Sequence, residues 1–226
     1  MLKLLKKSTR QSNSGPEIYE NVVEARKQLK NPSNFKRYAR EILDLVPKKT
    51  GTVLDVGCGL GWLVQEANKR GFDAWGVDSS KTLVRFGKAK LGLNLSNSFP
   101  KNKFDIVIAK HVLEHIKPAE PFLKKILNSL APEGVFIVAC PNNKSLMHWI
   151  FGSRWYGLCP NQHVWQFTPK ILSVLLEVNG FNIDKIIINS LDYKPGGIKQ
   201  GAFWFLTNLA NILRIGDQVI IICSRR

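Results

Sequence analysis

The chain has 226 residues, of which 44% are hydrophobic, and its 33 Lys and Arg against 17 Asp and Glu give a formal net charge of +16. That hydrophobic share excludes a disordered chain, and the length suits one domain with a sizeable core. The basic excess favours an anionic neighbour such as nucleic acid, anionic lipid or a phosphorylated substrate, or else a Lys-rich solvated surface.

The first 16 residues are basic and contain no acid, so we expect a disordered basic tail followed by a single domain over residues 17–226. The tail has no apolar run of secretory-signal length, and no run in the chain reaches the roughly 18 apolar residues of a spanning helix. The cysteines form no CxxC pair, which favours buried, reduced thiols over a zinc site. We therefore expect a cytoplasmic protein.

The first half of the domain alternates helical and strand patterns. Helical spacing and end signals predict helices over residues 17–29, 33–46, 62–70 and 80–90. Short apolar runs predict the strands "TVLDV" and "DAWGVD", with "LNL" as a stunted third strand.

The second half continues the alternation. The predicted strands are "FDIVIAK", "GVFIVACP", "FNIDKIIIN" and "DQVIIICS", and the predicted helices span residues 118–130, 169–179 and 201–213. Residues 142–168 are expected to form a long loop, a lid on the substrate side. The alternation predicts an α/β fold with a doubly wound, mostly parallel seven-stranded sheet, whose core spans residues 50–224 behind N-terminal helices. Ligands of such sheets bind at the carboxyl ends of the strands.

The stretch "VLDVGCGLGW" places a glycine loop directly after the first strand of this sheet. Its spacing is GxGxG, with Trp62 where a dinucleotide fingerprint needs its third glycine, and no Gly-Lys-Ser/Thr follows as in a P-loop. The carboxylate of Asp55 suits a ligand with a cationic end. Asp78, at the end of the second strand, can accept hydrogen bonds from ribose hydroxyls. A ribose joined to a cationic amino-acid portion describes S-adenosylmethionine.

Five motifs in the right order resemble the class I S-adenosylmethionine-dependent methyltransferases, in particular the small bacterial-type group that includes ubiquinone-biosynthesis O-methyltransferases. The resemblance covers residues 50–224. It rests on "VLDVGCGLGW", "WGVDSS", "FDIVIAKHVLEHI", "LAPEGVFIVACPN" and "NQHVWQFTP".

The resemblance implies a role for each matching residue. The methionine part of the cofactor would contact Asp55, Gly57, Cys58, Gly59 and Gly61. The ribose would contact Asp78 and Ser79, and the region of the reacting methyl would contact Lys110 and His111. As alternatives, the glycines would only make a turn and Asp78 would only cap a helix.

The segment after the third strand departs from the family pattern. It contains no acid before Asp105 to bind the adenine amine, so Asn94, Ser96 or Asn97 would substitute there.

Methyl transfer to a hydroxyl needs a general base. The candidates are His163, His115 and His111, and the aromatic residues around His163 suit a lid over an organic acceptor. The alternatives are that His115 orients the loop after the fourth strand and that His163 anchors the lid. In the ubiquinone branch, acids and a histidine here can hold a divalent metal. This chain has His111 where that branch has an acid, so we expect no metal.

We therefore expect O-methylation of a small-molecule, lipid-precursor or glycan acceptor. A nucleic-acid methyltransferase is the first alternative, but "KHVLEH" stands where base N-methyltransferases carry Asn/Asp-Pro-Pro-Tyr/Phe. A non-catalytic binding module is the second alternative; the basic excess and the missing adenine acid favour it, and the complete glycine loop opposes it. The sequence does not determine the oligomeric state.

Residues 198–216 carry more apolar side chains than one helix face needs. Five of them fall on one face at helical spacing: Phe203, Leu206, Leu209, Ala210 and Leu213. Trp204, Phe205 and Ile212 widen that surface. Either the N-terminal helices or a second subunit cover the surplus, or Trp204 and Phe205 enter an anionic membrane interface as a peripheral contact.

Overall fold

We describe the fold from a computed structural model, which covers residues 15–190 and 199–226 and gives side-chain environments for residues 22–190 and 204–226. The expected basic tail lies, except for its last two residues, outside the described residues, and so does the side chain of Phe203.

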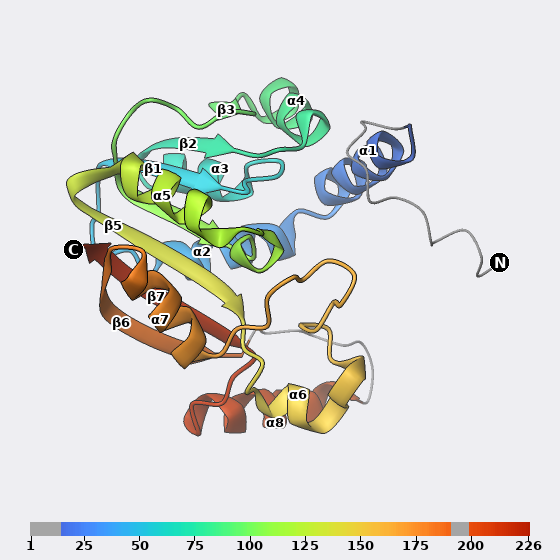
Figure 1. Cartoon of the computed structure of the whole chain (residues 1–226). Coiled ribbons are helices and arrows are strands. Elements are labelled where there is room, and N and C mark those ends of the chain that lie inside the picture. The colour runs from blue at the N-terminus through green and yellow to red at the C-terminus, as the bar shows by residue number, and fades with distance from the viewer. Residues whose placement is uncertain (1–14, 191–198) are drawn as a thin grey trace.

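The described chain forms one seven-stranded sheet in the order β3-β2-β1-β4-β5-β7-β6 (Figure 1). The strands are β1 Thr52–Val56, β2 Asp73–Val77, β3 Leu95–Ser96, β4 Phe104–Lys110, β5 Leu130–Pro141, β6 Phe181–Asn189 and β7 Gln218–Arg225. Only β7 runs antiparallel to its neighbours, β5 and β6, among these described strands. The doubly wound, mostly parallel sheet predicted from the alternation of elements is confirmed.

The helices follow the predicted order, with one addition. They are α1 Gly15–Lys30, α2 Ser33–Leu43, α3 Trp62–Lys69, α4 Lys81–Leu91, α5 Ala119–Ser129, α6 Leu146–Phe151, α7 Pro169–Val178 and α8 Lys199–Ile212, with the 3-10 turns η1 Leu113–His115 and η2 Gly152–Arg154. Helix α6 lies in the stretch expected to be all loop. The Ser145 hydroxyl begins it by accepting the backbone N–H of His148 at 3.0 Å. With one turn and a half and an exposed apolar face, it lacks the periodicity that predicts a helix.

The core has two halves because the central strands are covered on both faces. Leu54 packs in a cluster with buried residues of α5 and α7, and its neighbour Val53 packs in another with α2 and α3. Successive side chains of a strand point to opposite faces, so the continuous apolar runs of β1, β4 and β5 are what a two-sided core requires.

The covered face of helix α8 overlaps the predicted apolar face only in part, since Leu206 and Leu209 are half-buried. Ala210 is buried, but so is Thr207, whose hydroxyl is satisfied by the Trp204 carbonyl at 2.9 Å. Leu213, expected on the buried face, is exposed, as is Ile212. Because the helix packs on the edge strand β6 and not across the sheet, a narrow strip of it is covered (Figure 1). No described helix has the length and hydropathy of a membrane-spanning segment.

Candidate active site

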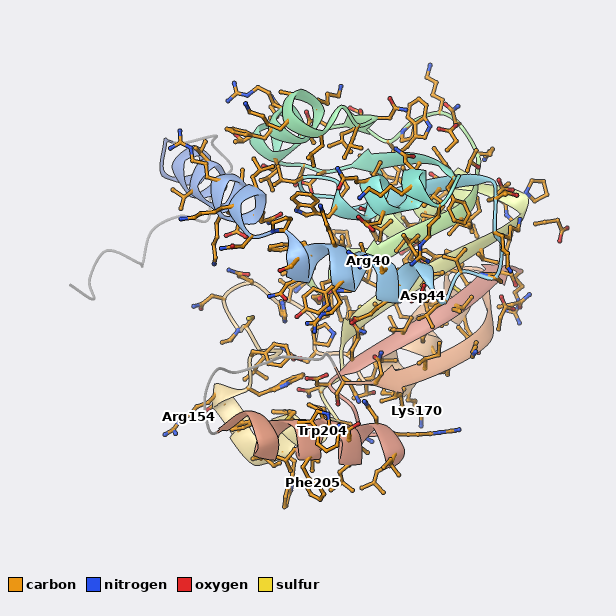
Figure 2. The ribbon with its side chains drawn as sticks, turned by 180° about the vertical axis from the view of Figure 1, so that it is seen from behind. Arg40, Asp44, Arg154, Lys170, Trp204 and Phe205 are labelled. Atoms are coloured by element: carbon orange, nitrogen blue, oxygen red, sulfur yellow. The ribbon has the colours of Figure 1, made fainter. Side chains whose placement is uncertain are left out.

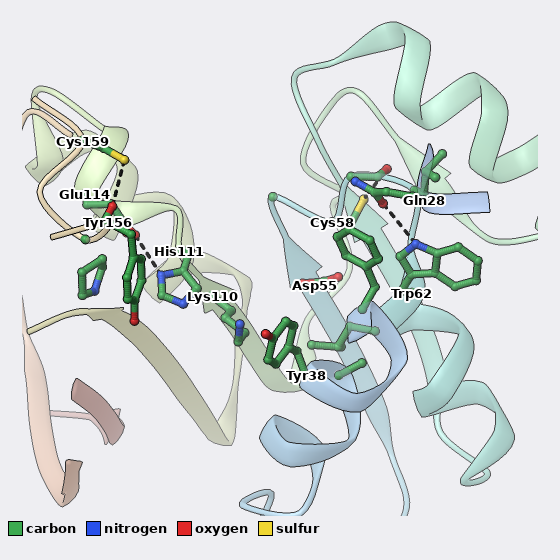
Figure 3. A pocket seen from close by; sticks show the side chains of 18 of the residues that line it. Gln28, Tyr38, Asp55, Cys58, Trp62, Lys110, His111, Glu114, Tyr156 and Cys159 are labelled. Carbon is green, nitrogen blue, oxygen red and sulfur yellow. Dashed lines mark hydrogen bonds and ion pairs between the residues drawn. The ribbon is translucent and has the colours of Figure 1, made fainter. Parts of the chain in front are cut away.

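A cavity of about 580 Å³ lies where β1, β4 and β5 end at their carboxyl ends (Figure 3). Its walls come from the glycine loop after β1, from α1 and α2, from the segment after β4, and from the lid. Their principal side chains are those of Gln28, Tyr38, Asp55, Lys110, His111 and His163. The volume falls within the usual range for small-molecule sites.

The three glycines of the loop all have left-handed backbone conformations but serve different purposes. Gly57 has φ +77°, and a Cβ there would meet Val112 Cγ2 at 2.3 Å, so its lack of a side chain is a packing requirement. Gly59 has φ +54° and borders the cavity, with the nearest atom to an added Cβ 4.0 Å away. The space beside Gly59 is therefore open to a ligand.

Gly61, expected at the cofactor, does not line this cavity. It precedes α3, and a Cβ there would lie 2.8 Å from Leu93 Cδ1. Its role in this structure is to let α3 start against Leu93 and Leu95.

Asp78 braces the loop. One carboxylate oxygen accepts the N–H of Gly59 at 2.8 Å, and the other accepts the N–H of Ser80 at 2.7 Å. The cap of α4 is Ser80, whose hydroxyl accepts the N–H of Leu83, so the alternative that Asp78 only caps this helix is wrong. Asp78 is next to Gly59 but, like the exposed Ser79, is not among the residues that line the cavity.

The carboxyl group of Asp55 is buried in the cavity wall, with 5% of the residue exposed. Burial and the nearby charge of Asp78 raise its pKa to about 7, and Lys110 offsets only part of this. A buried carboxyl group that is costly to ionise would be stabilised in its charged form by a cationic ligand.

Lys110, at the end of β4, lies between Tyr38 and His111 in the middle of the cavity (Figure 3). Its ammonium sits 4.9 Å from the centre of the Tyr38 ring. Burial lowers its pKa to about 8, although Glu41, Glu114 and Asp55 act in the opposite direction. Lys110 thus divides the end near Asp55 from the end near His111.

His111 is held at both ring nitrogens. Nδ1 lies 3.1 Å from Glu114 Oε1 and Nε2 lies 3.0 Å from Gln218 Oε1. Its φ of +54° is uncommon for a residue other than glycine. Burial and the charge of Lys110 lower its pKa. With both nitrogens engaged, His111 is placed to support the wall and not to accept a proton from an acceptor.

His115 and His163 come together edge to face, with ring centres 4.7 Å apart. His163 Nδ1 lies 2.9 Å from the Gly157 carbonyl, and His115 Nδ1 lies 3.1 Å from the Gln162 carbonyl. A carbonyl only accepts, so in each neutral ring Nδ1 carries the proton and Nε2 keeps its lone pair. Only His163 of this pair lines the cavity.

A buried carboxylate stands beside these two histidines. Glu114 Oε2 has no hydrogen-bond partner within the described chain, and one ligating atom each from Glu114, His115 and His163 lie within 4.8 Å of one another. Two imidazoles and a carboxylate are a donor set that could hold a divalent metal. The sequence analysis expected no metal, because His111 stands where the ubiquinone branch has an acid, and it did not group these three residues because His163 comes from the lid, far along the chain from Glu114 and His115.

The lid is hydrogen-bonded to η1 and to Asp217, directly before β7. The Glu114 carbonyl accepts the N–H groups of Val164 and Trp165, at 2.9 and 3.2 Å. The Tyr156 hydroxyl donates to Asp217, and burial together with that carboxylate raises the pKa of the phenol. These contacts make residues 152–168 a fixed wall in this structure.

Sequence reasoning missed the walls from the N-terminal helices. Gln28 of α1 accepts the indole N–H of Trp62 at 3.1 Å, and Tyr38 of α2 covers Lys110. No motif marks either residue. Of the proposed adenine contacts, Asn97 bonds to the Asp78 carbonyl at 2.9 Å, and neither it, Asn94 nor Ser96 lines the cavity.

A family model described as a methyltransferase domain matches residues 30–186. Among curated relatives, a ubiquinone biosynthesis O-methyltransferase from Bradyrhizobium diazoefficiens is 33% identical over 144 residues, 55% of either chain. A mitochondrial ubiquinone biosynthesis O-methyltransferase from Rattus norvegicus is 24% identical over 155 residues, 59% of this chain and 45% of that protein. The chain thus spans about half the length of the curated relatives it matches.

Solved structures share the fold. A SAM-dependent methyltransferase from Archaeoglobus fulgidus aligns with a TM-score of 0.60 and 22% identity, over 84% of this chain and 93% of that one. A methyltransferase from Thermotoga maritima, described as a possible histamine N-methyltransferase, aligns with a TM-score of 0.64 and 16% identity, over 93% and 99%. At these identities the likeness concerns the fold alone.

The raised pKa of Asp55 predicts a stability that depends on pH. Its folded-state pKa of about 7 lies above the ordinary 3.8, so the folded protein loses stability from this group as pH rises from about 4 to about 7. Asp55→Asn removes the charge. We expect the unliganded variant to exceed wild type in free energy of unfolding by a few kcal/mol at pH 8 and by little at pH 4.

Denaturant unfolding at several pH values measures this difference. Asp73→Asn, the same change at an exposed strand end, is the control and should show no such rise. A difference between Asp55→Asn and wild type that stays constant from pH 4 to pH 8 would contradict the prediction.

Proposed function

The chain belongs to the family of S-adenosylmethionine-dependent methyltransferases, and from that premise we propose that it transfers a methyl group to a hydroxyl oxygen of a small-molecule, lipid-precursor or glycan acceptor. One observation carries the proposal. A single cavity has a buried carboxyl group and an open glycine loop at one end, and at the other end it has His163, whose Nδ1 bonds to a carbonyl and whose Nε2 has no hydrogen-bond partner among the described residues.

The residues at the first end fit the cofactor. S-adenosylmethionine has a cationic amino group and a sulfonium, and Asp55 is a buried carboxylate incompletely offset by Lys110. The open space at Gly59 accommodates a ligand close to the backbone. Asp78 keeps lone pairs free beyond its two backbone hydrogen bonds, which ribose hydroxyls would use. The buried thiol of Cys58, whose pKa is raised by burial, stays neutral beside the ligand.

The cofactor supplies a methyl group on a positively charged sulfur that serves as leaving group. The protein's part is to bind both partners in line and to remove the acceptor proton. His163 fits the second task, because its Nδ1–H on the Gly157 carbonyl fixes the tautomer in which Nε2 accepts a proton. The buried carboxylate of Glu114, close to both histidines, would stabilise the imidazolium that forms.

Labelled methyl transfer tests the reaction class. Purified protein is incubated with methyl-labelled S-adenosylmethionine and, separately, with small-molecule, lipid, glycan and nucleic-acid fractions of a cell extract. We expect label as a methyl ether in one of the first three fractions. Label in nucleic acid would favour the alternative that the basic charge suggests. Cofactor binding with no transfer to any fraction would leave a non-catalytic binding module.

The open space at Gly59 generates the next prediction. Gly59→Arg should abolish S-adenosylmethionine binding by filling that space, and Asp78→Ala should weaken binding by releasing the loop. Isothermal titration measures the affinity. Gly71→Arg is the matched control, since Gly71 also has a positive φ with open surroundings but lies outside the cavity. Wild-type affinity in a cooperatively folded Gly59→Arg protein would refute the site.

His163→Ala should lower turnover by about 10²–10⁴-fold while the affinity for S-adenosylmethionine stays unchanged. His148→Ala, a histidine outside the cavity, is the control. Turnover is measured with and without a chelator. A loss below about threefold would make His163 an anchor of the lid. An equal loss in chelator-treated wild type would assign His163 to metal binding with Glu114 and His115.

A further inference from the structure

Helices α6 and α8 form an exposed apolar surface that the cavity does not use. We call it the α6–α8 surface and define it by the exposed side chains of Trp149, Ile150, Phe151, Trp204, Phe205, Ile212 and Leu213. Trp149 is 83% exposed, Trp204 63% and Phe205 60%. Contiguous apolar patches on a soluble protein commonly mark a contact with a partner or a membrane.

The two helices belong to one surface because the backbone joins them. The N–H of Leu146, at the start of α6, donates to the carbonyl of Ile215, after α8, at 2.9 Å. The Asn142 amide donates to the Gly216 carbonyl at 2.8 Å. Both views show α6 and α8 side by side at the end of the molecule away from α4 (Figures 1 and 2).

The N-terminal helices do not cover this surface. In Figure 1, α1 lies toward the far end of the molecule and α2 lies behind the sheet, while α8 is at the bottom. This removes one of the two packing explanations for the surplus of apolar residues in α8. A second copy of the chain and a bilayer remain.

The charges around the surface discriminate between a second copy of the chain and a bilayer. Residues 142–176 and 199–216 contain no Asp or Glu at all. Lys144, Arg154, Lys170 and Arg214 are exposed in or next to the surface, and Figure 2 shows Arg154 and Lys170 on either side of Trp204 and Phe205. Two copies facing each other here would bring only positive charges together, on a chain with a net charge of +16. An anionic bilayer complements the same surface.

We propose that the α6–α8 surface docks on an anionic lipid bilayer, with Trp149, Trp204 and Phe205 in the headgroup region and the basic side chains on the lipid phosphates. Trp and Phe are well suited to this region, because their rings are large and apolar and Trp also has a polar N–H. The contact is peripheral, since these are surface helices with one exposed apolar face each.

Docking would place the bilayer beside the lid. The chain passes from α6 through η2 directly to Tyr156 and Gly157, which line the cavity. A membrane-dissolved acceptor would then have a short path to the cavity; this consequence rests on the proposed function, whereas docking itself does not.

Vesicle cosedimentation tests the proposal with the full chain and no cofactor. Vesicles of phosphatidylglycerol mixed with phosphatidylcholine are compared with pure phosphatidylcholine, at low and high salt. We expect wild type to pellet with the anionic vesicles, less at high salt and little with phosphatidylcholine alone. Trp204→Ser/Phe205→Ser should bind about ten- to a hundredfold more weakly, because two large apolar side chains no longer enter the bilayer.

Val174→Ser/Val178→Ser is the matched control, since it removes two exposed apolar side chains of α7 outside the surface. It should bind vesicles as wild type does. Equal pelleting of both double variants with wild type, or no pelleting of wild type at low salt, overturns the proposal. A concentration-dependent dimer in sedimentation analysis that only Trp204→Ser/Phe205→Ser dissolves would also overturn it, and assign the surface to self-association. Retained S-adenosylmethionine binding by the variants leaves the proposed function standing if docking fails.

Discussion

Parallel pairing of β1 with β2 brings two carboxylates together at the carboxyl ends of these strands, and the rest of the site depends on this pair. The register that pairs Val56 with Val77 places Asp55 and Asp78 near each other at the carboxyl ends of the strands. The negative charge of Asp78 is stabilised by two backbone N–H groups. One of them belongs to Gly59, so this hydrogen bond also fixes the conformation of the glycine loop. Asp55 accepts no such hydrogen bonds from the described residues, and its burial together with the charge of Asp78 raises its pKa to about 7. The fold thus stores an electrostatic cost that a cationic ligand would relieve.

The acceptor end of the cavity depends on Glu114 in a similar way. Its backbone carbonyl holds two N–H groups of the lid, and one carboxylate oxygen holds His111. Burial alone would raise the pKa of this carboxyl group. The hydrogen bond and charge of His111 lower the pKa by more, so that it lies below its usual range. The same residue therefore positions the lid and supplies a negative charge next to His115 and His163. Removing its side chain would disturb the histidines, whereas its backbone hydrogen bonds to the lid would remain.

The lid also connects the cavity to the α6–α8 surface. Tyr156, in the cavity wall, donates to Asp217, which directly precedes β7 and follows the turn joined to α6. Only a few residues and hydrogen bonds therefore connect a contact at α6 and α8 to the cavity wall that faces the acceptor. In a chain with so few acids in this region, burial of Asp217 against Tyr156 also removes a negative charge from the surface.

The sequence by itself determined the features encoded within a few neighbouring residues. The apolar runs of β1 and β4 and the glycine loop with Asp55 before it are local patterns, and the doubly wound, mostly parallel sheet follows from the alternation of strands with helices. Only the tertiary structure decided which side chains from distant parts of the chain meet at the carboxyl ends of the strands. Tyr38 with Lys110, His111 with Gln218, and His163 with Glu114 join residues far apart in the chain, and no local periodicity records such pairs. The packing of α8 on an edge strand likewise decided that Leu213 is exposed, because its neighbours, and not its own sequence, set which face is covered.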